Sequence, residues 1–101
     1  MCEPRPTRTV IVGNPEGVHA RAATLIAGTV RRFRSKVQLV KSRHRVDATD
    51  VLQILSVGAG EGTELQLEAV GDDAEAALDA LVELFRGKFG DNAQAERQDN
   101  K

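Results

Sequence analysis

The segment from residue 64 to residue 87 constrains the fold more than any other part of the chain. Residues 64–70 alternate between polar and apolar side chains, which is typical of a β-strand with one buried face. Gly71 then supplies a turn, and Asp72 with Glu75 three residues later predicts a capping box at a helix start. Apolar side chains follow at helical spacing until Gly87 stops the pattern: Ala74, Ala77, Leu78, Leu81, Val82 and Phe85. A one-sided strand followed by a one-sided helix predicts a sheet covered by helices.

The rest of the chain supplies three more strand patterns and two more helical patterns. β-Branched or alternating runs predict strands over residues 9–12, 36–41 and 44–46. Apolar spacing predicts helices over residues 20–33 and 51–56. The order is strand, helix, strand, strand, helix, strand, helix. It predicts an α+β fold in which one four-stranded sheet carries the helices on a single face.

Length and composition bound the domain organisation. The chain has 101 residues, enough for one small domain, and its three aromatic residues are all Phe. The core must therefore be built mainly from Val, Leu, Ile and Ala. We expect a flexible segment over residues 1–8, a folded domain over residues 9–88 and a disordered polar tail over residues 89–101.

The charge balance argues against a general nucleic-acid binder. Lys and Arg number 14, Asp and Glu number 15, and a basic excess is absent. Residues 31–45 are locally basic, which leaves an RNA- or ligand-binding α+β module open as an alternative. The scarcity of aromatic residues weakens that alternative, because base stacking needs them.

The remaining composition fits a cytoplasmic protein without cofactors. The single cysteine, Cys2, lies in a terminal segment and has no partner for a disulfide and no metal-ligand pattern around it. No apolar run has the length of a membrane span, and the N-terminus lacks the apolar centre of a signal peptide. We expect no metal, no cofactor and no membrane insertion.

His19 is the residue best placed for chemistry. It follows a glycine-rich turn that ends at Gly17, and it directly precedes a predicted helix. A helix N-terminus offers unsatisfied N–H groups and partial positive charge, which suit an anion. The amides of Ala20 and Arg21, together with the Arg21 guanidinium, would complete a phosphoryl-binding group. These residues alone are equally compatible with an ordinary first-turn histidine beside a solvated arginine. His44, between two arginines, is expected to be an exposed hairpin residue.

The stretch Gly-Val-His-Ala-Arg-Ala-Ala over residues 17–23 resembles a known signature. That signature, Gly-(Leu/Ile/Val)-His-Ala-Arg-Pro-Ala, belongs to the HPr family, the histidine-containing phosphocarriers of the bacterial phosphoenolpyruvate-dependent sugar phosphotransferase system. Residues 46–58 resemble the second-helix segment of the family, and residues 71–73 with the following helix resemble its last helix. The family fold is an open-faced β-sandwich with the order of elements predicted above, so the resemblance implies a four-stranded antiparallel sheet with three helices on one face.

The resemblance implies a phosphocarrier function. His19 would take a phosphoryl group on its δ nitrogen from enzyme I, itself charged by phosphoenolpyruvate, and an EIIA-type domain would receive it. Arg21 matches the arginine that steadies the phosphoryl group. The protein would act as a stoichiometric relay and not as an enzyme on its own, and a monomer is the expected state. The alternative within the family is a regulatory or binding module that acts by protein–protein contact, for example on transcriptional regulators.

The resemblance also implies a partner surface around the first two helices. Its members here would be Thr24, Arg31, Val51, Leu52 and Leu55. The competing interpretation for the three apolar residues is core packing. Leu52 is the better candidate for an exposed contact, because Val51 and Leu55 share one side of a short helix.

Two positions depart from the family pattern. Ala22 stands where the family usually has proline, which restores an amide donor in the first helical turn. Asp50 stands where many members have a regulatory serine. Its fixed negative charge could imitate a phosphoserine in part, but aspartate is also a good helix N-cap, and we favour the capping interpretation.

Overall fold

Four strands and three α-helices alternate along residues 5–90, the part of the chain that the computed structural model describes. The elements are β1 (Thr7–Ile11), α1 (Ala20–Val30), β2 (Lys36–Lys41), β3 (His44–Asp47), α2 (Val51–Ser56), β4 (Glu64–Val70), α3 (Ala74–Arg86) and a final 3-10 turn, η1 (Lys88–Gly90). Their order is the predicted one. Cys2 and residues 91–101 of the predicted tail lie outside the described residues.

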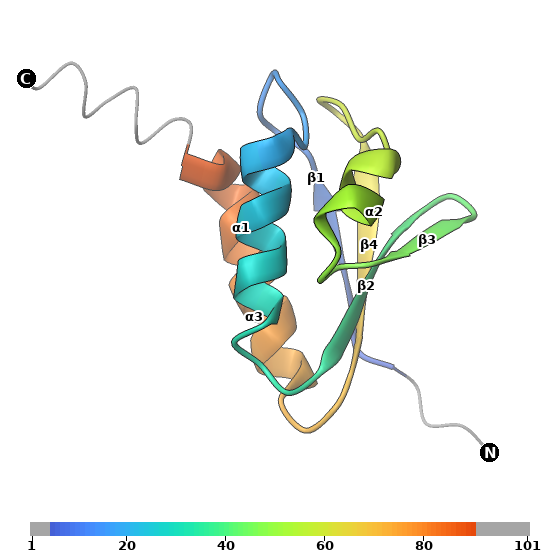
Figure 1. Ribbon diagram of the computed structural model, residues 1–101, viewed down its shortest axis with the longest axis vertical. Helices are drawn as coiled ribbons and strands as arrows, with labels where there is room; N and C mark the ends of the chain where they lie inside the picture. Colours follow the sequence, from blue (N-terminus) through green and yellow to red (C-terminus); the bar gives the residue numbers. More distant parts are fainter. Residues whose placement is uncertain (1–4, 91–101) are drawn as a thin grey trace, which may run out of the picture.

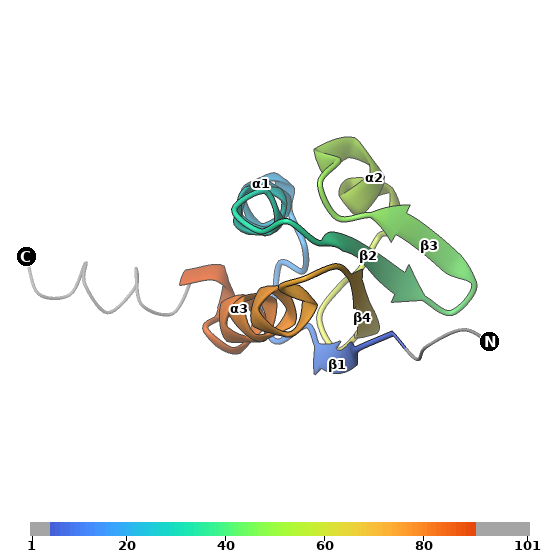
Figure 2. The same ribbon diagram turned by 90° about the horizontal axis from the view of Figure 1, so that it is seen from below.

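The sheet has the strand order β1-β4-β2-β3, and every neighbouring pair is antiparallel. In Figures 1 and 2 the three helices lie on one side of this sheet, and its other face is open. The predicted α+β architecture is therefore confirmed. Strand β4 is central in this sheet, since Leu67 pairs with Arg8 on one side and with Leu39 on the other.

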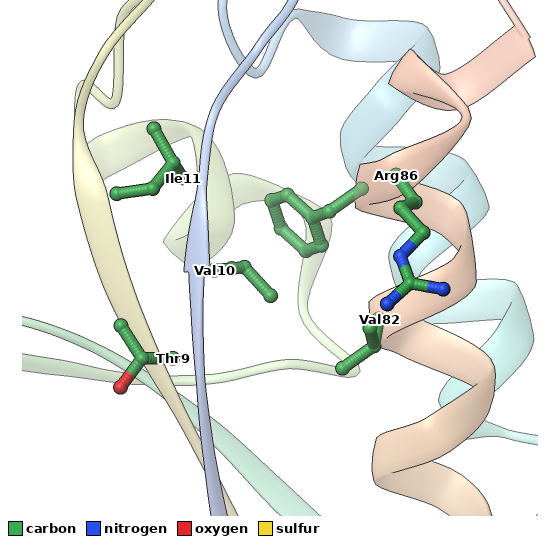
Figure 3. A pocket seen from close by; sticks show the side chains of 6 residues that line it. Thr9, Val10, Ile11, Val82 and Arg86 are labelled. Atoms are coloured by element: carbon green, nitrogen blue, oxygen red, sulfur yellow. The ribbon is translucent and has the colours of Figure 1, made fainter.

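The core lies between the sheet and the helices. The alternate residues Leu65, Leu67 and Ala69 of β4 are fully buried, as the sequence pattern predicts. Helices α1 and α3 supply the facing layer, with Ala23, Ile26, Ala27, Ala77, Leu78 and Leu81 buried. Figure 3 shows the same alternation in β1: Val10 points toward α3, whereas Thr9 and Ile11 point to the opposite face.

Two element boundaries differ from the predictions by more than one residue. Helix α1 ends at Val30 and not at residue 33, because the backbone tightens there: Arg32 N donates to Thr29 O at 3.1 Å and Phe33 N donates to Val30 O at 3.0 Å. Strand β1 begins at Thr7, inside the segment expected to be flexible, because it pairs with β4 from that residue onward.

The capping box predicted at Asp72 is wrong. The N-cap of α3 is Asp73, and its side chain makes no capping hydrogen bond. Its carboxylate instead accepts hydrogen bonds from Arg34 N at 3.0 Å and from the Ser35 hydroxyl at 2.6 Å. Asp73 therefore ties the start of α3 to the loop between α1 and β2.

Phe89 corrects the boundary expected between domain and tail. It is 1 % exposed, and its ring lies edge-on to Phe85 with 4.8 Å between the ring centroids. The turn η1 brings it back onto the core through left-handed backbone at Lys88 and Phe89. The folded domain therefore extends past residue 88.

Candidate functional site

The turn before α1 is fixed by Gly17 and Asn14. Gly17 adopts a φ of +69°, and a Cβ there would lie 2.5 Å from the carbonyl oxygen of Ala59. Asn14 is fully buried; its side-chain Nδ2 donates to Gly17 O at 2.6 Å, and its backbone carbonyl oxygen accepts from Gly17 N at 3.0 Å. Val18 N donates to Ala59 O at 2.9 Å, which anchors the turn to the loop after α2. The backbone leading to His19 is therefore held on both sides.

His19 is the N-cap of α1. Its backbone is extended, with a φ of −89° and a ψ of −175°, and its Nδ1 accepts a hydrogen bond from Ala22 N at 3.2 Å. A ring nitrogen that accepts a hydrogen bond carries a lone pair and no proton. Nε2 lies 3.7 Å from Glu16 Oε1, and the side chain is 25 % exposed. The imidazole is thus held with Nδ1 toward the helix N-terminus and remains within reach of solvent.

The positive end of α1 surrounds this nitrogen. The first intrahelical bond runs from Ala23 N to His19 O at 2.8 Å. The N–H groups before it have no acceptor within the helix and contribute to the partial positive charge at its start. Ala20, predicted as a backbone phosphate ligand, is the exposed first residue of this turn.

The side chain of Arg21, in the same turn, reaches the last residues of the domain. Its Nη1 donates to the carbonyl oxygen of Phe89 at 2.9 Å. In Figure 1 the start of α1, the loop after α2 and η1 all lie at one end of the molecule. His19, Arg21 and Gly17 lie in the turn before α1 and the first turn of α1, where their sequence positions predict them, whereas the parts played by Asn14 and Phe89 were not predicted. An asparagine three residues before a turn glycine was the available signal for Asn14; Phe89 had none.

The residues of the expected partner surface differ in exposure and in position. Leu52 is 77 % exposed, which agrees with its selection as the better contact candidate. Val51 and Leu55 are half-buried against the core, and Thr24 is exposed on α1. Arg31 lies at the opposite end of α1 from His19, where its Nη2 donates to Thr49 O at 2.7 Å.

Asp50 caps α2, as predicted. Its carboxylate accepts from Gln53 N at 3.2 Å. The residues before it are also joined by side-chain hydrogen bonds, since Asp47 Oδ1 accepts from both the hydroxyl and the N–H of Thr49. Those two bonds hold the pKa of Asp47 below its ordinary value. Asp50 lies next to Thr49, which binds Arg31 at the C-terminal end of α1, and so it is not at the end of α1 where His19 lies.

Other ligand sites are not evident in the described part of the chain. Residues 5–90 contain no group of three or more His, Cys, Asp or Glu side chains that could hold a metal ion. None of the helices described there is long and apolar enough to cross a membrane. One shallow hollow lies between β1 and the end of α3, lined by Val10, Val82 and Arg86 among others (Figure 3), and it includes neither His19 nor Arg21.

Residues 6–87 match a protein family described as the PTS HPr component phosphorylation site. A phosphocarrier protein HPr of Treponema pallidum is 45 % identical over 82 residues, which cover 81 % of this chain and 93 % of that protein. A phosphocarrier protein NPr of Shewanella violacea is 38 % identical over 82 residues, covering 81 % of this chain and 90 % of that protein.

Solved structures give the same result for the fold. A crystal structure of HPr from Thermoanaerobacter tengcongensis has a TM-score of 0.82 and 37 % identity, and the match covers 85 % of this chain and 97 % of the other. HPr from Bacillus anthracis has a TM-score of 0.78 and 29 % identity, covering 82 % of this chain and 99 % of the other. The four-stranded sheet and its three helices are common to these proteins.

Proposed function

The chain belongs to the HPr family, the phosphocarriers of the phosphotransferase system, and from that premise we propose that Nδ1 of His19 is the atom that carries the phosphoryl group. The observation that supports this assignment best is the hydrogen bond from Ala22 N to that nitrogen. It keeps the proton off Nδ1 and aims its lone pair at the positive end of α1. His44, the other histidine, is exposed on the β2–β3 hairpin and has no such surroundings.

The surroundings of His19 suit a group that must be held and then released. A phosphoryl group on Nδ1 would face the N–H groups of the first turn, with Ala20 and Arg21 as the expected backbone donors. A guanidinium has five N–H donors, so Arg21 can hold the Phe89 carbonyl and a phosphoryl oxygen together. The partial exposure of the ring leaves the phosphorus accessible to the next acceptor.

The partner proteins follow from this assignment. Enzyme I, charged by phosphoenolpyruvate, would supply the phosphoryl group in the cytoplasm, and an EIIA-type domain would receive it. Leu52 is the apolar side chain most available for contact, and Thr24, exposed on α1, and Arg31 are the other expected members of this surface. A monomer presents this surface to each partner in turn. The protein would turn over no substrate by itself, because each phosphoryl group it receives must leave to a partner.

The relay is tested by following phosphate from phosphoenolpyruvate to an acceptor. Enzyme I and a purified EIIA-type domain are incubated with labelled phosphoenolpyruvate, with and without this protein. We expect label on the acceptor only when the wild-type chain is present, and none with His19→Ala. Label on the chain without any transfer to EIIA-type domains would instead favour a regulatory module that acts by protein contact.

A further inference from the structure

The geometry points to a specific task for the backbone amide of Ala22: after charging, it binds an oxygen of the phosphoryl group on His19 and stabilises the phosphorylated protein. This inference rests on the proposed role of His19. In the unphosphorylated chain the same amide donates to Nδ1 at 3.2 Å. The donor therefore already lies at the atom where the phosphorus would be attached.

The amide has no competing role in the helix. Ala22 is the third residue of α1, and the first bond within the helix is made by Ala23 N. Ala22 is also fully buried, so water does not compete for its N–H. The HPr signature quoted above has proline at this position, and proline carries no N–H. The donor is a property of this chain's Ala22 and is absent from any carrier that follows the signature.

Charging gives the Ala22 N–H a new hydrogen-bond acceptor. The Nδ1 lone pair forms the bond to phosphorus. The bond between phosphorus and the atom of enzyme I that carried it breaks, and the electron pair of that bond stays on the enzyme I atom. Nε2 keeps its proton throughout. A phosphorus atom cannot fit on the 3.2 Å line between Nδ1 and Ala22 N, so the ring must turn as the bond forms. A phosphoryl oxygen then takes the place of Nδ1 as acceptor.

This exchange favours the phosphorylated state. The bond to neutral Nδ1 is replaced by a bond to an oxygen that carries negative charge, and charge-assisted hydrogen bonds are about twice as strong as neutral ones. We therefore expect the amide to raise the equilibrium constant for charging about five- to tenfold.

Two variants separate the amide from the side-chain volume. Ala22→Pro removes the N–H, and proline is tolerated in a first helical turn. Ala22→Val also adds carbons at this buried position but keeps the N–H. Each variant and the wild type is brought to equilibrium with catalytic enzyme I at a fixed ratio of phosphoenolpyruvate to pyruvate, and the phosphorylated fraction is measured by intact mass.

We expect the equilibrium constant to fall about five- to tenfold in Ala22→Pro and to stay within about twofold of wild type in Ala22→Val. Equal constants for Ala22→Pro and wild type, or an equal fall in both variants, would overturn the inference. A wild type that takes up no phosphate would refute the proposed function instead.

A second readout uses the wild type alone and does not depend on how well the variants fold. On phosphorylation, the amide proton of Ala22 should move downfield in a ¹H–¹⁵N spectrum, farther than the amide protons in the second half of α1. An Ala22 signal that moves no more than those signals would show that its N–H finds no phosphoryl oxygen.

Discussion

The guanidinium of Arg21 donates to the carbonyl oxygen of Phe89 at 2.9 Å, and this bond joins the first turn of α1 to the last turn of the domain. The carbonyl is in place because Phe89 is buried against Phe85. A residue near the end of the chain thus restrains an arginine that lies two positions from His19. The restraint limits the conformations of a long side chain, which lowers the entropy lost when that side chain binds a phosphoryl oxygen.

Removal of Arg21 should affect charging more than folding. We expect Arg21→Ala to slow charging by enzyme I roughly tenfold, because one charge-assisted contact to the phosphoryl group is lost. The free energy of unfolding should change by less than about 1.5 kcal/mol, since a single hydrogen bond to a carbonyl is removed. Stopped-reaction mass spectrometry and urea unfolding give the two values. Arg32→Ala removes the same charge from an exposed position beyond α1, and an equal slowing there would mean that net charge, not Arg21, controls the rate.

Gly17 should tolerate no side chain. A methyl group there would meet Ala59 O at 2.5 Å and Gly60 Cα at 2.8 Å, at a φ of +69°. We expect Gly17→Ala to lower the free energy of unfolding by about 1–3 kcal/mol and to slow charging, because the turn that aims His19 must shift. Gly60→Ala is the matched control, since no atom lies within 4 Å of its Cβ position. Equal stability of the two variants in urea would contradict the assignment of Gly17 as the constrained position.

Two substitutions at Asp50 distinguish its role as a helix cap from an effect of its negative charge. Asp50→Ala should lower the free energy of unfolding by about 1 kcal/mol, because the bond from Gln53 N is lost. Asp50→Ser keeps a capping oxygen and removes the negative charge, so we expect both stability and the charging rate by enzyme I to match the wild type. A faster rate in Asp50→Ser, with unchanged stability, would show instead that the aspartate damps exchange with enzyme I.

The hydrogen bonds accepted by the Asp73 carboxylate predict that the stability of the fold depends on pH. Hydrogen bonds from the Ser35 hydroxyl and from Arg34 N hold the pKa of Asp73 below its ordinary value. These bonds are absent in the unfolded chain, where an aspartate has a pKa of about 3.9. The stabilisation is therefore complete above that pH and is lost as the pH falls through the lower folded pKa.

Urea unfolding midpoints measured from neutral pH down into this acid range test the direction in which stability changes with pH. Asp73→Asn should be less stable than the wild type at neutral pH, and the difference should shrink on acidification. Asp72→Asn makes the same change at the exposed neighbour and should leave the pH profile as it is. A constant difference between Asp73→Asn and the wild type at every pH would contradict the account.

Local patterns predicted the elements well where one face of an element is buried along its whole length. Strand β4 and strand β2 have the predicted bounds, because their alternation reflects a sheet covered on one face. Ends that depend on distant partners were not predictable in this way. Asp72 was predicted to cap α3, yet the N-cap is Asp73, and its carboxylate accepts a hydrogen bond from Ser35, which is 38 positions away. Phe89 follows a glycine that normally ends a helix, and only its contact with Phe85 reveals it as core.

The site was predictable to a similar extent. The position of His19 between a glycine turn and a helix follows from sequence, and so does its place beside Arg21. The bond from Ala22 N to Nδ1 required the rotamer of the imidazole, which a sequence does not contain. The support from Asn14 and from Ala59 O arises from packing between segments, and no local pattern encodes it.

The most direct test of the account is the intact mass of the protein after incubation with phosphoenolpyruvate and a bacterial enzyme I, for wild type and His19→Ala in parallel. We predict a single acid-labile phosphate on the wild type, as expected for a phosphohistidine, and none on His19→Ala, while His44→Ala charges like the wild type. Phosphate on His19→Ala, or none on the wild type with an enzyme I that charges its own carrier, would contradict the assignment of His19 as the carrier residue.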